Sequence, residues 1–131
     1  MTPQQRAQRW LDDDFLVFDT ETTGLGDDDE IVEICLIDRN GFIMLNTLIK
    51  PTKPIPAEAT AIHDITNEMV ANAPTWRDVH GAVGNLFFKY GFVAYNASFD
   101  SRMIIQSASL HGLGDDALCS FIEEYSRCAM L

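Results

Sequence analysis

The sequence has few cysteines and no long hydrophobic run. Its three cysteines, Cys35, Cys119 and Cys128, are odd in number and lack CxxC spacing, which argues against a disulfide framework or a zinc site and fits a reducing cytosol. No apolar stretch approaches the length that crosses a bilayer, so we expect no membrane contact. Met1 to Trp10 has no apolar core of the kind that a secretory signal needs. We therefore expect a cytoplasmic protein.

Basic residues are also scarce. The chain has 9 Lys and Arg against 20 Asp and Glu, which gives a formal net charge of −11. This balance argues against a protein that binds nucleic acid by broad charge neutralisation. It leaves open an enzyme that holds a strand end through metal ions, because divalent cations invert the local sign of a carboxylate site. The 131 residues, 47% of them hydrophobic, fit one globular domain.

Hydrophobic patterning predicts three strands in the first part of the chain. Phe15 to Phe18 is a short apolar run of strand formers that ends in a cluster of Asp, Glu, Thr and Gly. Ile31 to Ile37 and Phe42 to Ile49 predict two further strands, which Asn40-Gly41 joins as a hairpin. Prolines interrupt Lys50 to Pro56, where we expect an extended loop.

The second half of the chain alternates helical patterns with one strand. Thr75 and Asp78 form a capping box before a run with helical spacing. Phe92 to Tyr95 predicts a fourth strand, and Ser98 is the predicted cap of a helix that stops near Gly112. This order predicts an α/β fold with a mixed sheet. The other expected elements are short helices over Ala57–Ile62, from Thr66 or Asn67 to Val70 and over Phe121–Glu124, and a strand beginning at Cys128–Leu131.

Two carboxylates stand at the end of the first predicted strand. Asp19 and Glu21 are two residues apart, and because side chains alternate along a strand, both point to the same face while Thr20 points to the other. Two acids on one face repel each other unless a cation joins them. Gly24 lets the chain turn tightly just beyond the pair.

A third carboxylate, Asp100, lies in the first turn of the helix after the fourth strand. In an α/β sheet, sites collect at the carboxyl ends of strands, so Asp100 meets Asp19 and Glu21 if the fourth strand lies beside the first. Three convergent carboxylates suit two hard divalent ions, Mg²⁺ or Mn²⁺. Two such ions activate a water and stabilise the leaving oxygen of a phosphodiester.

Three stretches resemble, in the right order, the motifs of one enzyme family. Phe18 to Leu25 reads FDTETTGL and precedes an IVEI strand, Pro54 to Thr66 reads PIPAEATAIHDIT, and Tyr95 to Asp100 reads YNASFD. Together they resemble the DEDD (DEDDh-type) 3′→5′ exonucleases, the group of the epsilon proofreading subunit of bacterial DNA polymerase III and of RNase T. The resemblance covers residues 15 to about 110.

The resemblance implies an RNase H-like fold and hydrolysis of phosphodiester bonds at the 3′ end of single-stranded DNA or RNA, with two Mg²⁺ or Mn²⁺ ions. It makes Asp19, Glu21 and Asp100 the catalytic metal ligands, with Glu21 also near the terminal 3′-hydroxyl. The residues implied to contact the last nucleotides are Thr22, Thr23, Gly24, Leu25, His63, Asn96 and Phe99.

The third motif of this family, which supplies a histidine as general base and a fourth acid, has no counterpart in the sequence. His80 and His111 lack motif context, so no base is assigned. Asp64 replaces the usual glycine and Tyr95 the usual histidine, which bears on substrate contacts and not on the class. We expect residues 1–131 to form a single, incomplete exonuclease domain without its last helix. An uncovered sheet face would then promote homodimers or aggregation and leave the chain poorly active.

Two other functions stay open. One is a catalytically inactive exonuclease-like domain that binds a partner. The other, less favoured, is a calcium-binding EF-hand, although Gly26 stands where that loop needs an apolar residue and the flanking segments read as strands. The residues that match EF-hand loop positions 1, 3, 5, 6 and 12 are Asp19, Glu21, Thr23, Gly24 and Glu30.

The sequence does not distinguish DNA from RNA as the substrate.

Overall fold

The computed structural model describes residues 2–4, 15–94 and 97–129. Within them, one sheet has the strand order β3-β2-β1-β4. β1 pairs antiparallel with β2 and parallel with β4, and β2 pairs antiparallel with β3. The predicted mixed sheet is confirmed, as is the position of the fourth strand beside the first. The strands are β1 (Leu16–Thr22), β2 (Ile31–Asp38), β3 (Ile43–Leu48) and β4 (Phe92–Ala94).

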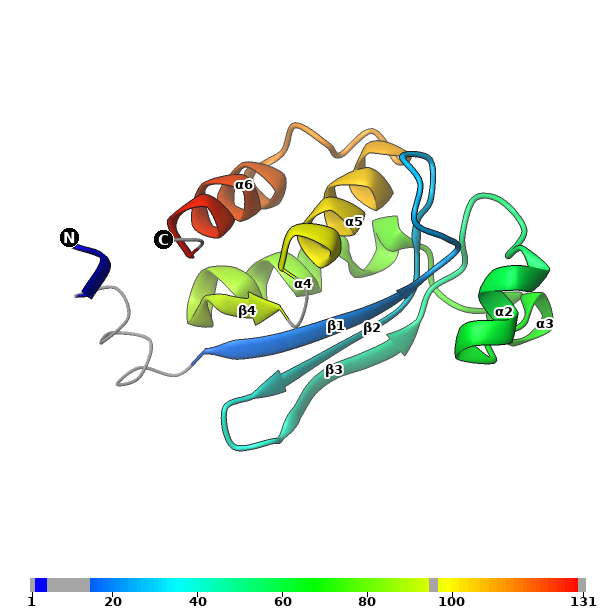
Figure 1. The fold of residues 1–131 in the computed structure, drawn as a ribbon, viewed down its shortest axis with the longest axis horizontal. Coiled ribbons are helices and arrows are strands. Elements are labelled where there is room, and N and C mark those ends of the chain that lie inside the picture. Colours follow the sequence, from blue (N-terminus) through cyan, green and yellow to red (C-terminus); the bar gives the residue numbers. More distant parts are fainter. Residues whose placement is uncertain (1, 5–14, 95–96, 130–131) are drawn as a thin grey trace.

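Helices cover the sheet unevenly (Figure 1). α4, α5 and α6 lie together over one face, whereas α2 and α3 stand beyond the carboxyl end of β1. Away from that end, no helix of the described residues lies over the opposite face. Among the same residues, no helix is both long and apolar enough to span a membrane. The helices are α2 (Ala57–His63), α3 (Asn67–Val70), α4 (Trp76–Tyr90), α5 (Ala97–Ser109) and α6 (Ala117–Ala129).

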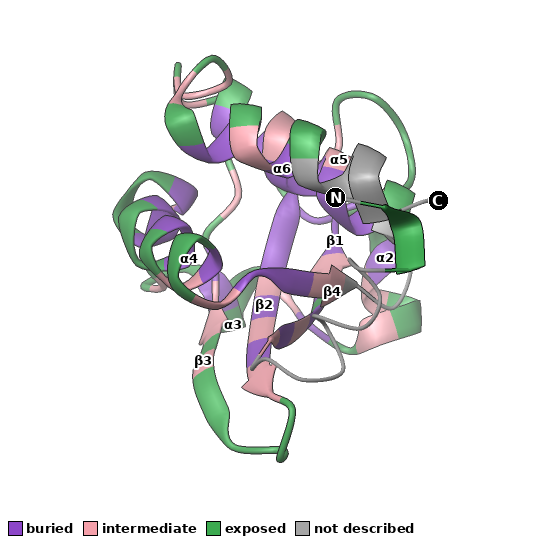
Figure 2. Cartoon of the chain, turned by 90° about the vertical axis from the view of Figure 1, so that its left-hand side faces the viewer, coloured by how far each residue is buried: buried purple, intermediate pink, exposed green. Residues whose placement is uncertain are grey.

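β1 separates the hydrophobic core from the carboxylates. Phe18 is fully buried beneath the helices, whereas Asp19 is exposed and Glu21 is half-buried. The Phe18 ring packs against Phe87 of α4 and Phe92 of β4, at centroid distances of 5.2 and 5.6 Å. Figure 2 shows this buried layer between the sheet and the helices. The packing fixes the strand register, because a slip of one residue would expose the phenylalanine and bury the carboxylates.

A bulge interrupts the pairing of β1 with β2 where the carboxylates stand. Glu21 lies opposite Glu33, but Thr22 lies opposite Ile31, which leaves Val32 as the extra residue on β2. Ile31 therefore joins the core under α4, α5 and α6, while Val32 joins a second cluster with residues of α2 and α3. The bulge thus ties the carboxyl end of β1 to α2.

The C-terminal segment differs from expectation. Sequence patterning predicts a short helix over Phe121–Glu124 and a strand over Cys128–Leu131, but a single helix runs from Ala117 to Ala129. The strand prediction is wrong for residues 128–129, and residues 130–131 lie outside the described part of the chain. The helix prevails because Leu118 and Ile122, four residues apart, are both buried in the main core.

Turns and caps agree in part with the sequence. Thr75 and Asp78 form the predicted capping box of α4. The predicted hairpin is present, with Gly41 at a φ of 89°, in the left-handed region that favours glycine. Ser98 does not cap α5, because that helix begins at Ala97 and places the serine inside its first turn.

Candidate active site

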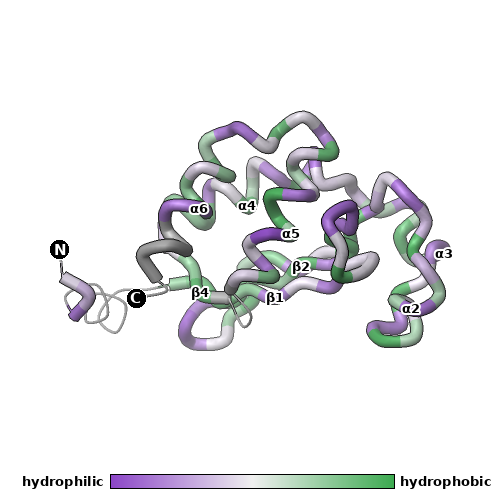
Figure 3. The backbone as a smooth tube through the Cα atoms, turned by 45° about the horizontal axis from the view of Figure 1, so that its top comes forward, coloured by the Kyte–Doolittle hydropathy of each residue, from purple (hydrophilic) through white to green (hydrophobic). Residues whose placement is uncertain are grey.

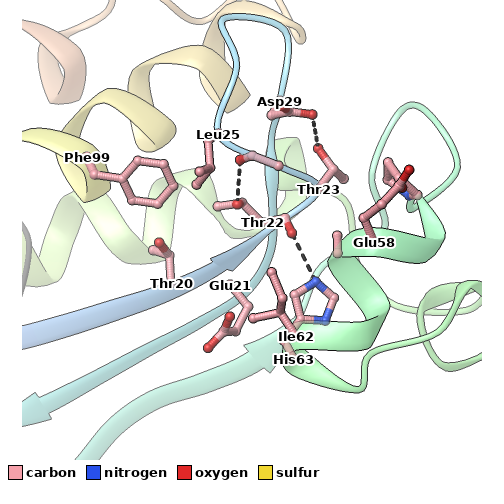
Figure 4. A pocket seen from close by; sticks show the side chains of 13 residues that line it. Thr20, Glu21, Thr22, Thr23, Leu25, Asp29, Glu58, Ile62, His63 and Phe99 are labelled. Carbon is pink, nitrogen blue, oxygen red and sulfur yellow. Dashed lines mark hydrogen bonds between the residues drawn. The ribbon is translucent and has the colours of Figure 1, made fainter.

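A cavity of about 490 Å³ opens at the carboxyl end of β1 (Figure 4). Its wall combines the end of β1, the loop that follows, α2 and the start of α5. Leu25 and Phe99 lie on one side of it, and Ile62 and His63 on the other. Asp19 and Asp100 lie outside the wall. The predicted site residues that line the cavity are Glu21, Thr22, Thr23, Gly24, Leu25, His63 and Phe99.

The carboxylates of β1 lie on the face of the sheet that the helices leave open. Burial raises the pKa of Glu21, and the negative charges of Asp19, Glu33 and Asp100 raise it further, against a lowering effect of His63. Asp19 and Asp100 therefore both act electrostatically on Glu21. A raised carboxyl pKa in a cavity wall is one sign of a functional site.

Asp100 approaches from the helix-covered side of β1. Its side chain is only 2% exposed, and its Oδ1 accepts a hydrogen bond of 2.7 Å from the hydroxyl of Thr20. Among the described residues, no three carboxylate, imidazole or thiol groups converge to hold one ion. The donors nevertheless have the chemistry that a hard divalent cation prefers. Asp19 and Glu21 lie on the open side of β1, and Asp100 lies on the helix-covered side.

His63 is held by the backbone through both ring nitrogens. Its Nδ1 accepts from the N–H of Ile65 at 3.1 Å, so Nε2 carries the proton and donates to the carbonyl of Thr22 at 3.0 Å. Asp64 adopts a φ of 64°, a left-handed conformation that glycine favours and aspartate tolerates. The turn is therefore preserved without the usual glycine. With both nitrogens engaged, the ring joins α2 to β1 and is not placed as a general base.

The loop after β1 closes around the side chain of Asp29. Its carboxylate accepts from the hydroxyl of Thr23 at 2.8 Å and from the N–H of Gly26 at 2.7 Å. A Cβ atom at Gly24 would lie 2.5 Å from Oδ2 of Asp29. A larger residue at position 24 would displace the Asp29 carboxylate from its hydrogen bonds with Thr23 and Gly26.

α5 holds the same loop from outside. Arg102 donates to the carbonyl of Leu25 at 2.8 Å. One turn further along, Gln106 donates to the carbonyls of Gly26 and Asp29, at 3.1 and 2.8 Å. Figure 3 shows this hydrophilic loop beside α5. The side chain of Leu25 remains 77% exposed at the mouth of the cavity, so the loop presents an apolar group on a rigid support.

The remaining candidates do not complete the site. Asn96 lies outside the described residues. The His80 ring is hydrogen-bonded to Trp76 and to Asp116, and His111 follows the end of α5. Neither histidine lines the cavity. No described residue is therefore assigned as the general base.

Sequence reasoning missed several residues that shape the cavity. The bond between Thr20 and Asp100 joins positions 80 apart, which no local pattern reveals. Ile62 is 83% exposed, and a large apolar residue next to the motif histidine was a usable signal. Arg102 stands two residues beyond Asp100, so it follows the second motif by about half a helical turn.

The sequence matches known exonucleases over most of its length. A family model described as an exonuclease covers residues 16–123. The uncharacterized exonuclease CP81 of Escherichia phage 186 is 68% identical over 130 residues, which cover 99% of this chain and 67% of that protein. DNA polymerase III subunit epsilon of Treponema pallidum is 37% identical over 100 residues, or 73% of this chain and 46% of that protein. Exodeoxyribonuclease 10 of Escherichia coli K12 is 39% identical over 89 residues, or 67% and 39%. The chain thus spans less than half the length of the last two.

Solved structures share the architecture. Exonuclease X, solved in complex with 5′ overhanging duplex DNA, superposes with a TM-score of 0.54 at 41% identity, over 69% of this chain and 53% of that one. Cell-death related nuclease 4 superposes with a TM-score of 0.64 over 82% and 43%, and at 18% identity it shows the fold alone. The fold is the RNase H-like fold of exonucleases, and the chain belongs to the exonuclease family.

Proposed function

We propose that the chain is a metal-dependent 3′→5′ exonuclease that removes nucleotides from a single-stranded DNA end. The proposal is carried by Glu21, which lies in the wall of a cavity with apolar side chains on two sides. The negative charges of Asp19 and Asp100 both raise the pKa of this carboxyl. The carboxylates suit cations and, through them, a phosphate, while the apolar sides suit a base. One cavity therefore offers partners for each part of a terminal nucleotide.

Asp19, Glu21 and Asp100 are the residues that would hold Mg²⁺ or Mn²⁺, because hard divalent cations prefer carboxylate oxygens. Two bound ions would supply an activated water and stabilise the leaving oxygen of the phosphodiester. The chain's own contribution is to hold Asp19 and Glu21 on β1 of the sheet and Asp100 in the first turn of α5. This placement keeps the cost of ordering them low when substrate arrives.

The terminal nucleotide enters between the two apolar sides of the cavity. Leu25 and Ile62 are 77% and 83% exposed, so each has apolar surface to bury against a base, and the ring of Phe99 extends the Leu25 side. Stacking and apolar contact accept any base, so we propose cleavage without sequence preference. Thr22, Thr23, Gly24, His63 and Asn96 keep their predicted role beside the last nucleotides.

We propose DNA as the polymer because of the relatives. One is named an exodeoxyribonuclease, and another was solved in complex with 5′ overhanging duplex DNA. The net charge of −11 disfavours long electrostatic contact with a duplex. Recognition is therefore proposed to centre on the strand end.

The test is hydrolysis of an oligonucleotide labelled at its 5′ end, with Mn²⁺ and with excess chelator. We expect a ladder of products shortened from the 3′ end that disappears with the chelator. Asp19→Asn lowers the rate by about 100-fold or more, because a metal site contributes several kcal/mol. Asp28→Asn, which removes an exposed charge in the neighbouring loop, is the matched control. Hydrolysis that survives both the chelator and Asp19→Asn, or that proceeds from the 5′ end, contradicts the proposal.

One alternative is an exonuclease-like domain that binds nucleic acid without cutting it, and the engagement of both ring nitrogens of His63 favours it. No described histidine is placed as a base, because His63 has both nitrogens engaged. An inactive domain would bind the oligonucleotide without hydrolysis at any Mn²⁺ concentration. Its binding would also be unchanged by Asp19→Asn.

A further inference from the structure

The hydroxyl of Thr20 has a place in the site that the proposed function does not assign. It donates to Oδ1 of Asp100 at 2.7 Å and joins β1 to the first turn of α5. We propose that Thr20 is a positioning residue whose hydroxyl orients the carboxylate of Asp100 and thereby sets the affinity of the site for divalent cations. This inference rests on the proposed function, since it concerns the same cation site.

The burial of both partners makes the hydroxyl hard to replace. Asp100 is 2% exposed and Thr20 is 8% exposed, so water does not readily take over the bond. The loss of a hydrogen bond to a buried carboxylate costs more free energy than the loss of one between neutral groups. Threonine is also stiff at χ1, and the direction of its hydroxyl is therefore fixed by the strand. Asp100 is oriented by a donor that does not itself move.

The position of Thr20 follows from strand alternation. Asp19 and Glu21 point to the open side of the sheet, and the residue between them points to the helix-covered side, where Asp100 lies. The tripeptide of residues 19–21 therefore contributes two carboxylates of its own and hydrogen-bonds the third, that of Asp100, through the Thr20 hydroxyl. Partners that orient metal ligands from outside typically change metal affinity by about 10–100-fold when removed.

The experiment compares Mn²⁺ binding by the whole chain and its variants, by calorimetry without substrate. Thr20→Val keeps the shape and the strand preference of the side chain but removes the hydroxyl, and we expect affinity about 10–100-fold weaker. Thr20→Ser restores the hydroxyl and returns affinity to the wild-type range. Thr47→Val is the matched control, because that hydroxyl bonds the carbonyl of the adjacent Leu48 on β3, at 2.9 Å. It should leave affinity unchanged.

A double-mutant comparison separates positioning from general damage. If Thr20 acts through Asp100, then Thr20→Val has no further effect on Mn²⁺ binding in an Asp100→Ala background, which lacks the acceptor of the Thr20 hydroxyl. Circular dichroism checks the fold, and Thr20→Ala replaces the valine variant if valine does not fold. Wild-type affinity in the valine or alanine variant overturns the inference, as does a serine variant that is as weak as valine. A wild-type chain that binds no Mn²⁺ overturns the proposed function together with the inference.

Discussion

The hydrogen-bonded chain from Trp76 through His80 to Asp116 makes a sharp stability prediction. Nε1 of Trp76 donates to Nδ1 of His80 at 2.9 Å, so Nε2 of the histidine carries the proton and donates to the Asp116 carboxylate. Asp116 also precedes α6 and accepts from the N–H of Cys119 at 3.2 Å. A single carboxylate therefore links α4 to the start of α6, and we expect Asp116→Ala to destabilise the fold.

The magnitude follows from the two contacts that alanine removes. His80 is 8% exposed, and an unpaired buried donor costs about 1–3 kcal/mol. Loss of an N-cap acceptor adds about 1 kcal/mol. Asp116 itself is 35% exposed, so solvent screens its charge and we add nothing for the Coulombic attraction. The expected loss is about 2–4 kcal/mol for alanine, and smaller for Asp116→Asn, whose single amide oxygen keeps an acceptor for one of the two contacts.

Urea unfolding followed by tryptophan fluorescence measures this loss. Trp76 is 1% exposed and belongs to the network, so its emission reports on the region directly. With an m-value of about 2 kcal/mol per molar urea, Asp116→Ala moves the midpoint down by about 1–2 M. A midpoint within about 0.3 M of the wild type, or equal losses for alanine and asparagine, would refute the reasoning.

The pH dependence of the same variant gives a second readout. Burial opposes ionisation of Asp116, but the hydrogen bonds from His80 and from the backbone of Cys119 outweigh it, and the pKa of this carboxyl is lowered. The stabilisation that the ionised Asp116 carboxylate provides is therefore complete above the pKa that this group has in the unfolded chain. It disappears as pH falls through the lower pKa of the same group in the folded state. The stability difference between the wild type and Asp116→Asn should narrow in that acid range and stay constant near neutral pH.

Three further predictions concern the cavity and its surroundings. Asp64→Val should lower the free energy of unfolding by about 1–2 kcal/mol, because residue 64 has a left-handed φ, whereas Asp64→Gly should be neutral or stabilising; equal midpoints for valine and glycine in thermal melts would contradict this. Ile62→Ser should raise the KM for oligonucleotides about tenfold with little change in kcat, since it removes apolar surface from the cavity wall; a fall in kcat alone would place the side chain in another role. Ile43 lies on the edge strand β3 and is 65% exposed. Ile43→Lys should therefore reduce the predicted self-association, measured by sedimentation velocity at high protein concentration, and an unchanged sedimentation coefficient would exclude that edge as the contact.

Local patterns predicted the parts of the site that lie within one element. Alternation along β1 was sufficient to place Asp19 and Glu21 on one face, and parallel pairing sets β4, which precedes the helix of Asp100, beside β1. The convergence of all three carboxylates on one cation stays a prediction. Contacts between elements could not be predicted from local patterns. The hydrogen bond from Thr20 to Asp100 depends on the packing of α5 against the sheet. The hydrogen bond from Arg102 to the carbonyl of Leu25 depends on where the loop after β1 folds back.

The C-terminal region was predicted less well for a related reason. A short apolar stretch near the chain end is compatible with either a strand or a helix until its partners are known. α6 is decided by burial of Ile122 against the main core, which is a tertiary effect. The capping box of α4, by contrast, was readable because Thr75 and Asp78 satisfy each other within one turn.

The bulge at Val32 also separates two hydrophobic clusters of unequal size. The larger core lies under α4, α5 and α6, whereas the smaller cluster contains Val32, Ile55, Ala59, Ile65 and Val70. Because the smaller cluster buries fewer apolar groups, it should open at a lower free energy, and its amides should exchange with solvent before those of the main core. One side of the cavity, with Ile62 and His63, comes from α2, whose Ala59 is buried in the smaller cluster. The other side, with Leu25 and Phe99, is anchored to α5. We therefore expect the two sides of the cavity to differ in stability, with the amides of α2 exchanging before those of α5.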